Sequence, residues 1–418
     1  MVSSLFSNAS CEQFRRDPRD FSRGGALSPE LLTTLLMYMV ADGNRRGYQH
    51  LLDGFWDEAR GFGLPLPTER AVSAASFCTA RHKITPEALR HALHEIATNT
   101  YATTFGASHR WYGRRVFAVD GTKVNLQRGD DLEQAFGVPD GAYCPQVLVS
   151  VMLDVCAKAP VDVEVSPFAF SEREHLLSML TSLETGDVVV LDRGYPSHEV
   201  LQALDLDGLD FLVRVPSSHS FSVIDELRAK AGSDAVVRLD PPKGAPPEWK
   251  AITVRVIRLQ APDGSESFFL TSLARADFSR EDLRELYHMR WESEEFYKLF
   301  KSPYIGQGQF RSKSPSGITQ EIHALVLFLA IARVIMATAA EVHDVDYEEL
   351  SQKAAVLGLA DYVTRLFLAT DHDYALEELL VLMRRISDRS YKRRKRKSYR
   401  RVSFRPRLRW GPGGRCGA

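Results

Sequence analysis

The stretch VFAVDGT, residues 116–122, decides the predicted fold of the chain. Four apolar residues lead directly to Asp120, and Gly121 and Thr122 follow at once. A short apolar run that ends at a turn signal is typical of a buried strand. Burying a carboxylate at such a place costs free energy unless something compensates the charge. Asp120 is therefore a candidate functional residue.

A second apolar strand ends in the same way, because Asp192 closes the run in VVVLDRGY, residues 188–195. Carboxylates at the carboxyl ends of neighbouring buried strands lie where an open α/β sheet presents its ligand site. The simpler alternative is that each aspartate only caps a turn. The two together favour a site, whereas Asp154 has no following glycine and is interpreted as structural.

The segments around these strands predict an α/β fold. Strand patterns at 114–126, 143–156, 161–168 and 186–195 alternate with helix patterns at 171–183 and 196–204, which is a mixed α/β core. A second β-rich run, residues 211–273, is broken by DPPKGAPPEW and looks like an inserted β domain.

Helical segments flank this core. Helix starts are predicted at Ser28-Pro29-Glu30, Pro67-Thr68-Glu69 and Thr85-Pro86-Glu87. A helix over 68–82 followed by one from Pro86 is either a helix-turn-helix DNA reader or a plain packing unit. The predicted regions are a helical amino-terminal domain (1–105), a core in two parts (106–205 and 279–340) around the β-rich insertion (206–278), a helical region (341–387) and a basic tail (388–418).

The segment YHMRWESEEFYKLFK, residues 287–301, predicts a helix with an unusual charged face. At about 100° per residue, one face carries Tyr287, Arg290, Glu294 and Lys301, whereas Glu292 and Glu295 point away. A solvated face with ion pairs is the simpler explanation. If Glu294 meets the two aspartates, however, three carboxylates form an all-oxygen site suited to Mg²⁺ or Mn²⁺. Two such ions support phosphoryl transfer, and the cations on this face would hold the phosphates.

The charge of the chain is unevenly distributed. The 418 residues carry 53 Lys plus Arg and 54 Asp plus Glu, for a net charge of -1. About 14 of the basic residues lie between Arg384 and Arg409. This tail suits the neutralisation of DNA phosphates, and a disordered solubilising tail is the alternative.

The sequence predicts a soluble protein of a reducing compartment. Five cysteines form no CxxC pair, which disfavours disulfides and a structural zinc site. The start, MVSSLFSNASCEQF, lacks the pattern of a signal peptide. The most apolar stretch, residues 324–340, carries Arg333 in its middle and is therefore expected to be a core helix, not a membrane span.

Three of these motifs resemble those of one known family, the DDE transposases of the insertion-sequence-four type. The spacing of Tyr287, Arg290, Glu294 and Lys301 resembles the YREK signature of that family. The DGT at Asp120 and the DRGY at Asp192 resemble its first and second acidic motifs, in the same order. The resemblance covers about residues 30–340, and the basic end is not part of the family pattern.

The resemblance implies a ribonuclease-H-like core with a β-rich insertion, and an amino-terminal helical domain that binds transposon ends. It implies cut-and-paste transposition by way of hairpin ends, catalysed by a pair of Mg²⁺ or Mn²⁺ ions. Asp120, Asp192 and Glu294 would be the catalytic metal ligands, and Tyr287, Arg290 and Lys301 would hold the terminal phosphates.

The implied partners are transposon-end DNA and target DNA, bound by a homodimer in the bacterial cytoplasm and nucleoid. Trp291 either stacks on a displaced base or is a core aromatic residue. Two other classes stay open: a ribonuclease-H-like nuclease that cuts without joining, and an inactive transposase-derived DNA-binding protein. The intact carboxylates and the charged helix face disfavour both.

Overall fold

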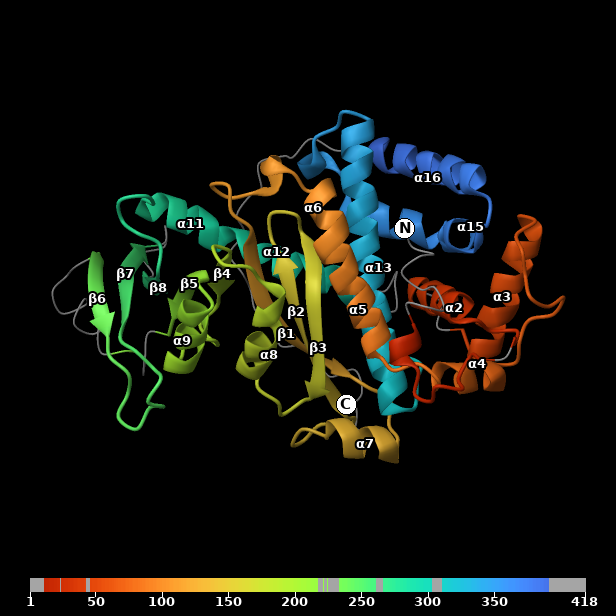
Figure 1. The fold of residues 1–418 in the computed structure, drawn as a ribbon, viewed down its shortest axis with the longest axis horizontal. Helices are drawn as coiled ribbons and strands as arrows, with labels where there is room; N and C mark the ends of the chain where they lie inside the picture. The colour runs from red at the N-terminus through yellow and green to blue at the C-terminus, as the bar shows by residue number, and fades with distance from the viewer. Residues whose placement is uncertain are drawn as a thin grey trace, which may run out of the picture.

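The computed structural model describes residues 11–22, 24–42, 46–216, 221, 224, 233–260, 266–302 and 310–390. Its centre is one eight-stranded mixed sheet in the order β3-β2-β1-β4-β5-β8-β7-β6 (Figure 1). The strands are β1 Val116–Asn125, β2 Gln146–Asp154, β3 Ala159–Pro167, β4 Val188–Leu191, β5 Asp210–Val215, β6 Asp234–Leu239, β7 Ile252–Gln260 and β8 Glu266–Thr271. The predicted α/β class is confirmed.

The first five strands form one part of the sheet. Strands β1, β2 and β3 pair antiparallel, whereas β4 runs parallel to β1 and β5 runs parallel to β4. The register places Ala118 opposite Val190. Because Asp120 and Asp192 each lie two residues further on, both aspartates arrive at the same end of the sheet.

Strand β5 lies within the predicted β-rich insertion, residues 206–278, but pairs parallel with β4. The other strands of that segment continue the sheet, since β8 pairs antiparallel with β5, and β7 and β6 follow outward as antiparallel neighbours. Strands β8, β7 and β6 therefore cover the edge of β5 that would otherwise expose unpaired backbone groups.

Helices cover both faces of the sheet (Figure 1). Helices α13 and α5 pack on β3, α8 packs on β2 and β3, α12 packs on β1, and α9 packs on β5 and β7. The helices are α2 Pro29–Ala41, α3 Tyr48–Gly61, α4 Ala74–Arg81, α5 Glu87–Glu95, α6 Tyr101–Thr104, α7 Asp130–Phe136, α8 Glu172–Met179, α9 His198–Leu206, α11 Arg280–Met289, α12 Trp291–Phe300, α13 Pro315–Val342, α14 Gln352–Ala360, α15 Val363–Leu368 and α16 His372–Ser387.

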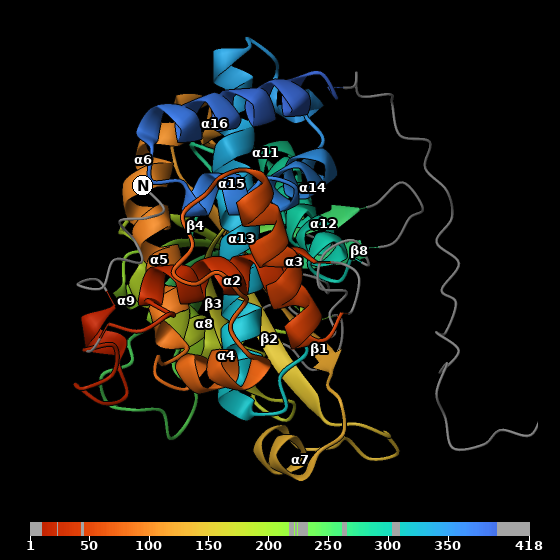
Figure 2. The same cartoon turned by 90° about the vertical axis from the view of Figure 1, so that its right-hand side faces the viewer.

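Helix α13 is the central helix, around which α2, α5, α14 and α16 pack (Figure 2). Among the described residues it is the one helix long and apolar enough to cross a membrane, but 89% of its most apolar window is buried inside the protein. Arg333 lies within it and is 2% exposed. The predicted core helix is confirmed.

The amino-terminal helices differ from the predicted ones at one start. Ser28 caps α2 as predicted, since its side chain accepts from the Leu31 N–H. The predicted start near Thr68 is wrong, because α4 begins at Ala74. The Thr68 hydroxyl instead donates to the Arg70 carbonyl in a local turn, and Ser73 caps the helix. Helix α5 packs between β3 and α13.

Buried ion pairs join the amino-terminal helices to the core. Arg81 of α4 lies 3.1 Å from Glu321 of α13, and both side chains are almost fully buried. Arg90 of α5 donates two hydrogen bonds to Asp162 of β3, at 2.7 and 3.0 Å. Separating either pair would leave a charge inside the protein without its partner, which is costly in free energy. The two pairs therefore hold α4 and α5 in one orientation on the core. The basic tail from residue 391 lies outside the described residues.

Candidate active site

Two aspartates form the base of the site, at the level of the sheet where β4 ends. Asp192 follows β4 directly, whereas Asp120 lies within β1, which continues to Asn125 in its pairing with β2; the expectation that Asp120 closes its strand is therefore wrong. Each carboxylate accepts a hydrogen bond from a backbone N–H that follows it in the chain. The Gly121 N–H donates to Asp120 Oδ1 at 2.9 Å, and the Gly194 N–H donates to Asp192 Oδ1 at 2.7 Å. These backbone donors orient the carboxylates.

The charges of the site act on one another. Burial raises the pKa of Asp120 to about 6, Arg290 and the Gly121 N–H oppose this, and Asp192 and Glu172 add to it. Like charges raise a carboxyl pKa only when they are close. The structure therefore gathers carboxylates from separate motifs into one small region.

Arg290 links the third predicted carboxylate, Glu294, to this region. Its Nη2 donates to Glu294 Oε1 at 3.2 Å, and its Nη1 lies 3.8 Å from Asp120 Oδ2. Burial disfavours the charge of Arg290, but Tyr287, Asp120 and Asp192 together raise its pKa. One guanidinium thus contacts residues of the first and third predicted motifs, and the charge of Asp192 in the second motif acts on it.

The helix that carries this face is interrupted at Arg290, which the sequence did not predict. Helix α11 ends at Met289 and α12 begins at Trp291. The Arg290 N–H donates to the Tyr287 carbonyl, and the Ser293 N–H donates to the Arg290 carbonyl, so the turn is tightened by three-residue hydrogen bonds. No glycine or proline lies at this point to signal the break.

The remaining residues of the predicted face also lie near the carboxylates. The Tyr287 ring packs edge-on against Phe269, and the Arg290 guanidinium lies 5.7 Å from the Tyr287 centroid. Lys301 Nζ donates to the Thr122 hydroxyl, which follows Asp120 and Gly121. Loss of solvation lowers the pKa of Lys301, and Asp120 opposes the shift.

Three further residues of α12, Trp291, Glu292 and Glu295, lie apart from the predicted site residues. Trp291 is 38% exposed, so it is not a core aromatic residue. Glu292 lies 3.5 Å from Lys158, and Glu295 pairs with Lys298 on the same helix. The two glutamates therefore point away from the site, as the helical projection predicted. Asp154 caps the turn after β2 by accepting the N–H groups of Cys156 and Ala157, which confirms its structural role.

Glu172, the first residue of α8, is a fourth carboxylate that the sequence interpretation missed. A Cβ on Gly121 would lie 2.5 Å from Glu172 Cδ, so the carboxylate occupies the space that the glycine leaves. The buried Tyr195 hydroxyl donates to Glu172 Oε2 at 3.5 Å. The glycine of DGT and the tyrosine of DRGY thus both contact Glu172. An acidic residue in a first helical turn has an ordinary explanation, so its sequence context carried no signal.

The residues fit a hard divalent cation by their chemistry. Their donors are carboxylate oxygens that repel one another, and a divalent ion relieves that repulsion. Within the described residues, no three His, Cys, Asp or Glu side chains stand as a ready metal cluster. Arg290 instead provides the positive charge between Asp120 and Glu294.

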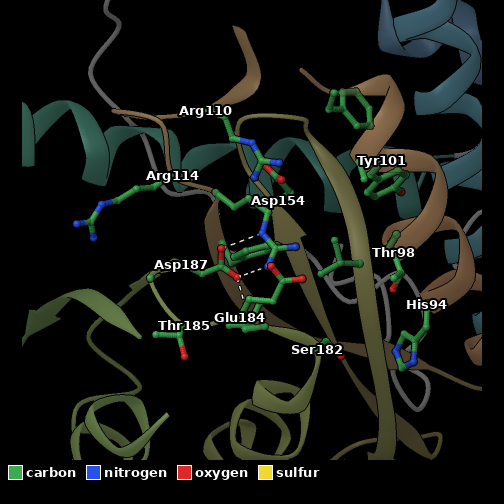
Figure 3. A pocket seen from close by; sticks show the side chains of 18 of the residues that line it. His94, Thr98, Tyr101, Arg110, Arg114, Asp154, Ser182, Glu184, Thr185 and Asp187 are labelled. Atoms are coloured by element: carbon green, nitrogen blue, oxygen red, sulfur yellow. Dashed lines mark hydrogen bonds and ion pairs between the residues drawn. The ribbon is translucent and has the colours of Figure 1, made fainter. Parts of the chain in front are cut away.

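A cavity of about 630 Å³ lies at the other end of β1 and β4 and contains none of the predicted site residues (Figure 3). Its charged groups are largely paired, since Arg115 donates to both carboxylate oxygens of Asp187 and Arg114 pairs with Asp210. Arg110 faces Asp154 across the cavity (Figure 3). The converging carboxylates at the opposite end favour that end as the site.

Comparisons with known proteins bear on the same segment of the chain. A family model described as a transposase DDE domain matches residues 111–331, which contain both aspartates and the whole charged helix face. No curated protein matches the chain. Among solved structures, it is similar to a cryo-EM structure of the piggyBac transposase synaptic complex with hairpin DNA. That similarity has a TM-score of 0.45 and 10% sequence identity over 91% of this chain and 82% of that chain. With its model matched over more than half of the residues, the chain belongs to the transposase DDE domain family.

Proposed function

We propose that the chain is a cut-and-paste DNA transposase of the insertion-sequence-four type, with Asp120, Asp192 and Glu294 as its catalytic carboxylates. The observation that carries the proposal is the position of Arg290, which joins Glu294 to Asp120 beside Asp192. Three motifs from distant parts of the chain meet there. Family membership supports metal-dependent phosphoryl transfer on DNA.

The carboxylates would hold two Mg²⁺ or Mn²⁺ ions. Such ions, when bound, help to activate the attacking oxygen and stabilise the leaving oxygen of an in-line displacement. Asp120 and Asp192 are already oriented by the backbone N–H groups of Gly121 and Gly194. Glu294 would turn from Arg290 to complete the set, and Arg290 would turn to the DNA.

The cationic face would hold the phosphate that reacts. Arg290 presents a planar fork suited to a phosphate, and its Nε is buried without a hydrogen-bond partner among the described residues. Lys301 adds a point charge above Thr122, and Tyr287 adds a hydroxyl. Trp291, which is exposed, would stack on a base displaced from the duplex.

The proposed reaction has four steps. Water attacks the phosphorus at the transposon end, the bond from phosphorus to the 3′ oxygen breaks, and a 3′-hydroxyl is freed. That hydroxyl attacks the phosphorus of the opposite strand, and the 3′ oxygen of the flanking DNA leaves as the hairpin forms. Water then attacks the hairpin phosphorus and frees the 3′-hydroxyl again. In the last step this hydroxyl attacks a phosphorus of target DNA, displaces a 3′ oxygen of the target strand and joins the two strands. A homodimer would hold both ends, with residues 1–105 contributing to end binding.

The test is cleavage of linear DNA that carries the sequences flanking the coding region. The full chain with Mg²⁺ is expected to release those ends with hairpin termini and to join them to a target plasmid; EDTA should stop both reactions. Cleavage without joining would identify a nuclease. Binding without cleavage in Mg²⁺ and in Mn²⁺ would indicate an inactive DNA-binding protein.

Arg290→Ala is expected to weaken the retention of cut ends. Its loss removes a bidentate phosphate contact, and we expect hairpin formation to fall about 10- to 100-fold while the first cut is affected less. Products resolved on denaturing gels would separate the two steps. The exposed Arg284→Ala, on α11, serves as control, and equal hairpin yields from both variants would remove Arg290 from the proposed role.

Gly121→Ala is expected to act through Glu172. The added Cβ must displace the Glu172 carboxylate, whose flexible end can move without unfolding the protein. Cleavage should fall about tenfold or more, since small misplacements in a site are costly. Glu172→Ala should give a similar loss, and the double variant should be no slower than either single one. Gly129→Ala is the control, because nothing lies near its Cβ position; additive losses would show that Gly121 acts independently of Glu172.

A further inference from the structure

Tyr297 lies on α12, one turn after Glu294, and its side chain reaches between β1 and β2. It is 8% exposed. Its hydroxyl donates to the Asp120 backbone carbonyl at 2.6 Å, with the Val149 carbonyl also at 3.3 Å. The same hydroxyl accepts the Val151 N–H at 3.1 Å. Tyr297 is therefore hydrogen-bonded to both strands.

These contacts fall at one particular place in the sheet. Asp120 and Val151 are cross-strand partners in the register of β1 and β2. The hydroxyl bridges the carbonyl of one partner and the amide of the other. A side chain from the helix thus enters the hydrogen bonding of the strand pair at the residue that carries the first carboxylate.

Tyr297 lies between two predicted site residues along its helix. Glu294 precedes Tyr297 by three residues and Lys301 follows it by four, so all three lie on neighbouring turns. The neighbouring Phe296 and Phe300 pack in the apolar core. Apolar contacts tolerate small shifts of the helix, whereas a hydrogen bond has narrow limits of distance and angle.

The hydroxyl remains protonated and able to donate. Burial raises the pKa of Tyr297 well above its usual value. Without the hydroxyl, the Val151 N–H and the Asp120 carbonyl lose a shared partner inside the protein, where unpaired backbone groups are costly. The two strands or α12 would move to restore the lost bonds.

We infer that Tyr297 is a positioning residue that sets Asp120 at the correct distance from Glu294. The inference rests on the proposed function, since it assumes that these two carboxylates act together. Tyr297 itself touches neither DNA nor a reacting atom; it acts through the backbone of Asp120.

The test compares Tyr297→Phe with Tyr347→Phe. Tyr347 is also 8% exposed, and its hydroxyl donates to the Ala157 carbonyl at 2.7 Å, away from the carboxylates. Both variants lose one buried tyrosine hydroxyl, which makes three hydrogen-bond contacts in Tyr297 and one in Tyr347, so thermal stability is measured for each. In single-turnover cleavage at saturating DNA, Tyr297→Phe should be about 10- to 100-fold slower and need more Mg²⁺ for half its maximal rate. Tyr347→Phe should stay within about twofold of the wild type.

Further readouts separate positioning from folding. DNA binding should be unchanged in Tyr297→Phe, and hydrogen exchange at the Val151 amide should accelerate. Tyr297→Met, with a flexible apolar side chain, is a second variant without the hydroxyl and should show the same loss. Cleavage by Tyr297→Phe at the rate and Mg²⁺ dependence of Tyr347→Phe would overturn the inference. A wild-type chain that cleaves no DNA would instead contradict the proposed function, and the inference would fall with it.

Discussion

Asp192→Ala is expected to abolish Mg²⁺-dependent cleavage and to leave binding of the DNA ends largely intact. Asp192 sits level with Asp120 at the end of β4, and its carboxylate is fixed by the Gly194 N–H. Metal ions contribute several kcal/mol to phosphoryl transfer, so loss of a ligand should slow cleavage by at least about 10³-fold. Cleavage assays and gel-shift binding on the same preparation would measure the two effects.

The matched control is Asp240→Ala. Asp240 also follows directly on a strand, β6, but it is exposed and pairs with Arg238, two residues before it. That variant should cleave like the wild type. Undiminished cleavage by Asp192→Ala would remove this residue from the catalytic set.

Glu321→Gln is expected to cause the largest loss of stability. Glu321 Oε1 accepts from Arg81 and from the Tyr48 hydroxyl, and Oε2 accepts the Arg311 N–H at 2.6 Å. Glutamine places an amide donor against these donors and leaves the buried Arg81 charge without its partner. Breaking a buried ion pair in this way costs about 3 to 5 kcal/mol.

Denaturant unfolding would measure that loss. The control is Glu281→Gln, which breaks an exposed pair with Arg284 on α11 and should change the free energy of unfolding by less than about 0.5 kcal/mol. Equal stability of the two variants would mean that the Arg81–Glu321 pair does not hold the amino-terminal helices to α13.

Much of the fold was predictable because its signals are local. The apolar runs that precede Asp120 and Asp192 became β1 and β4, and Ser28 capped α2 as its context indicated. Where tertiary contacts decide, the prediction failed. Thr68 forms a local turn instead of a helix start, and the helix is broken at Arg290 without a glycine or proline. The joining of β8 to β5 is also a long-range contact that local sequence does not encode.

The candidate site shows the same division. Spacing alone predicted that Arg290 and Glu294 share a face and that Glu292 lies elsewhere, because helical geometry is nearly uniform over short distances. Glu172 and Tyr297 could not be found in this way. Glu172 matters because it fills the space beside Gly121, and Tyr297 matters because its hydroxyl meets backbone groups of β1 and β2. These neighbours come together only in the folded chain.

The most direct measurement is anomalous diffraction from crystals of the chain with end DNA and Mn²⁺. The account predicts two anomalous peaks about 3.5 to 4 Å apart, contacting the carboxylates of Asp120, Asp192 and Glu294, with Arg290 released from Glu294 onto a phosphate. Ordered DNA with no peak at these carboxylates, and Arg290 still bound to Glu294, would contradict it.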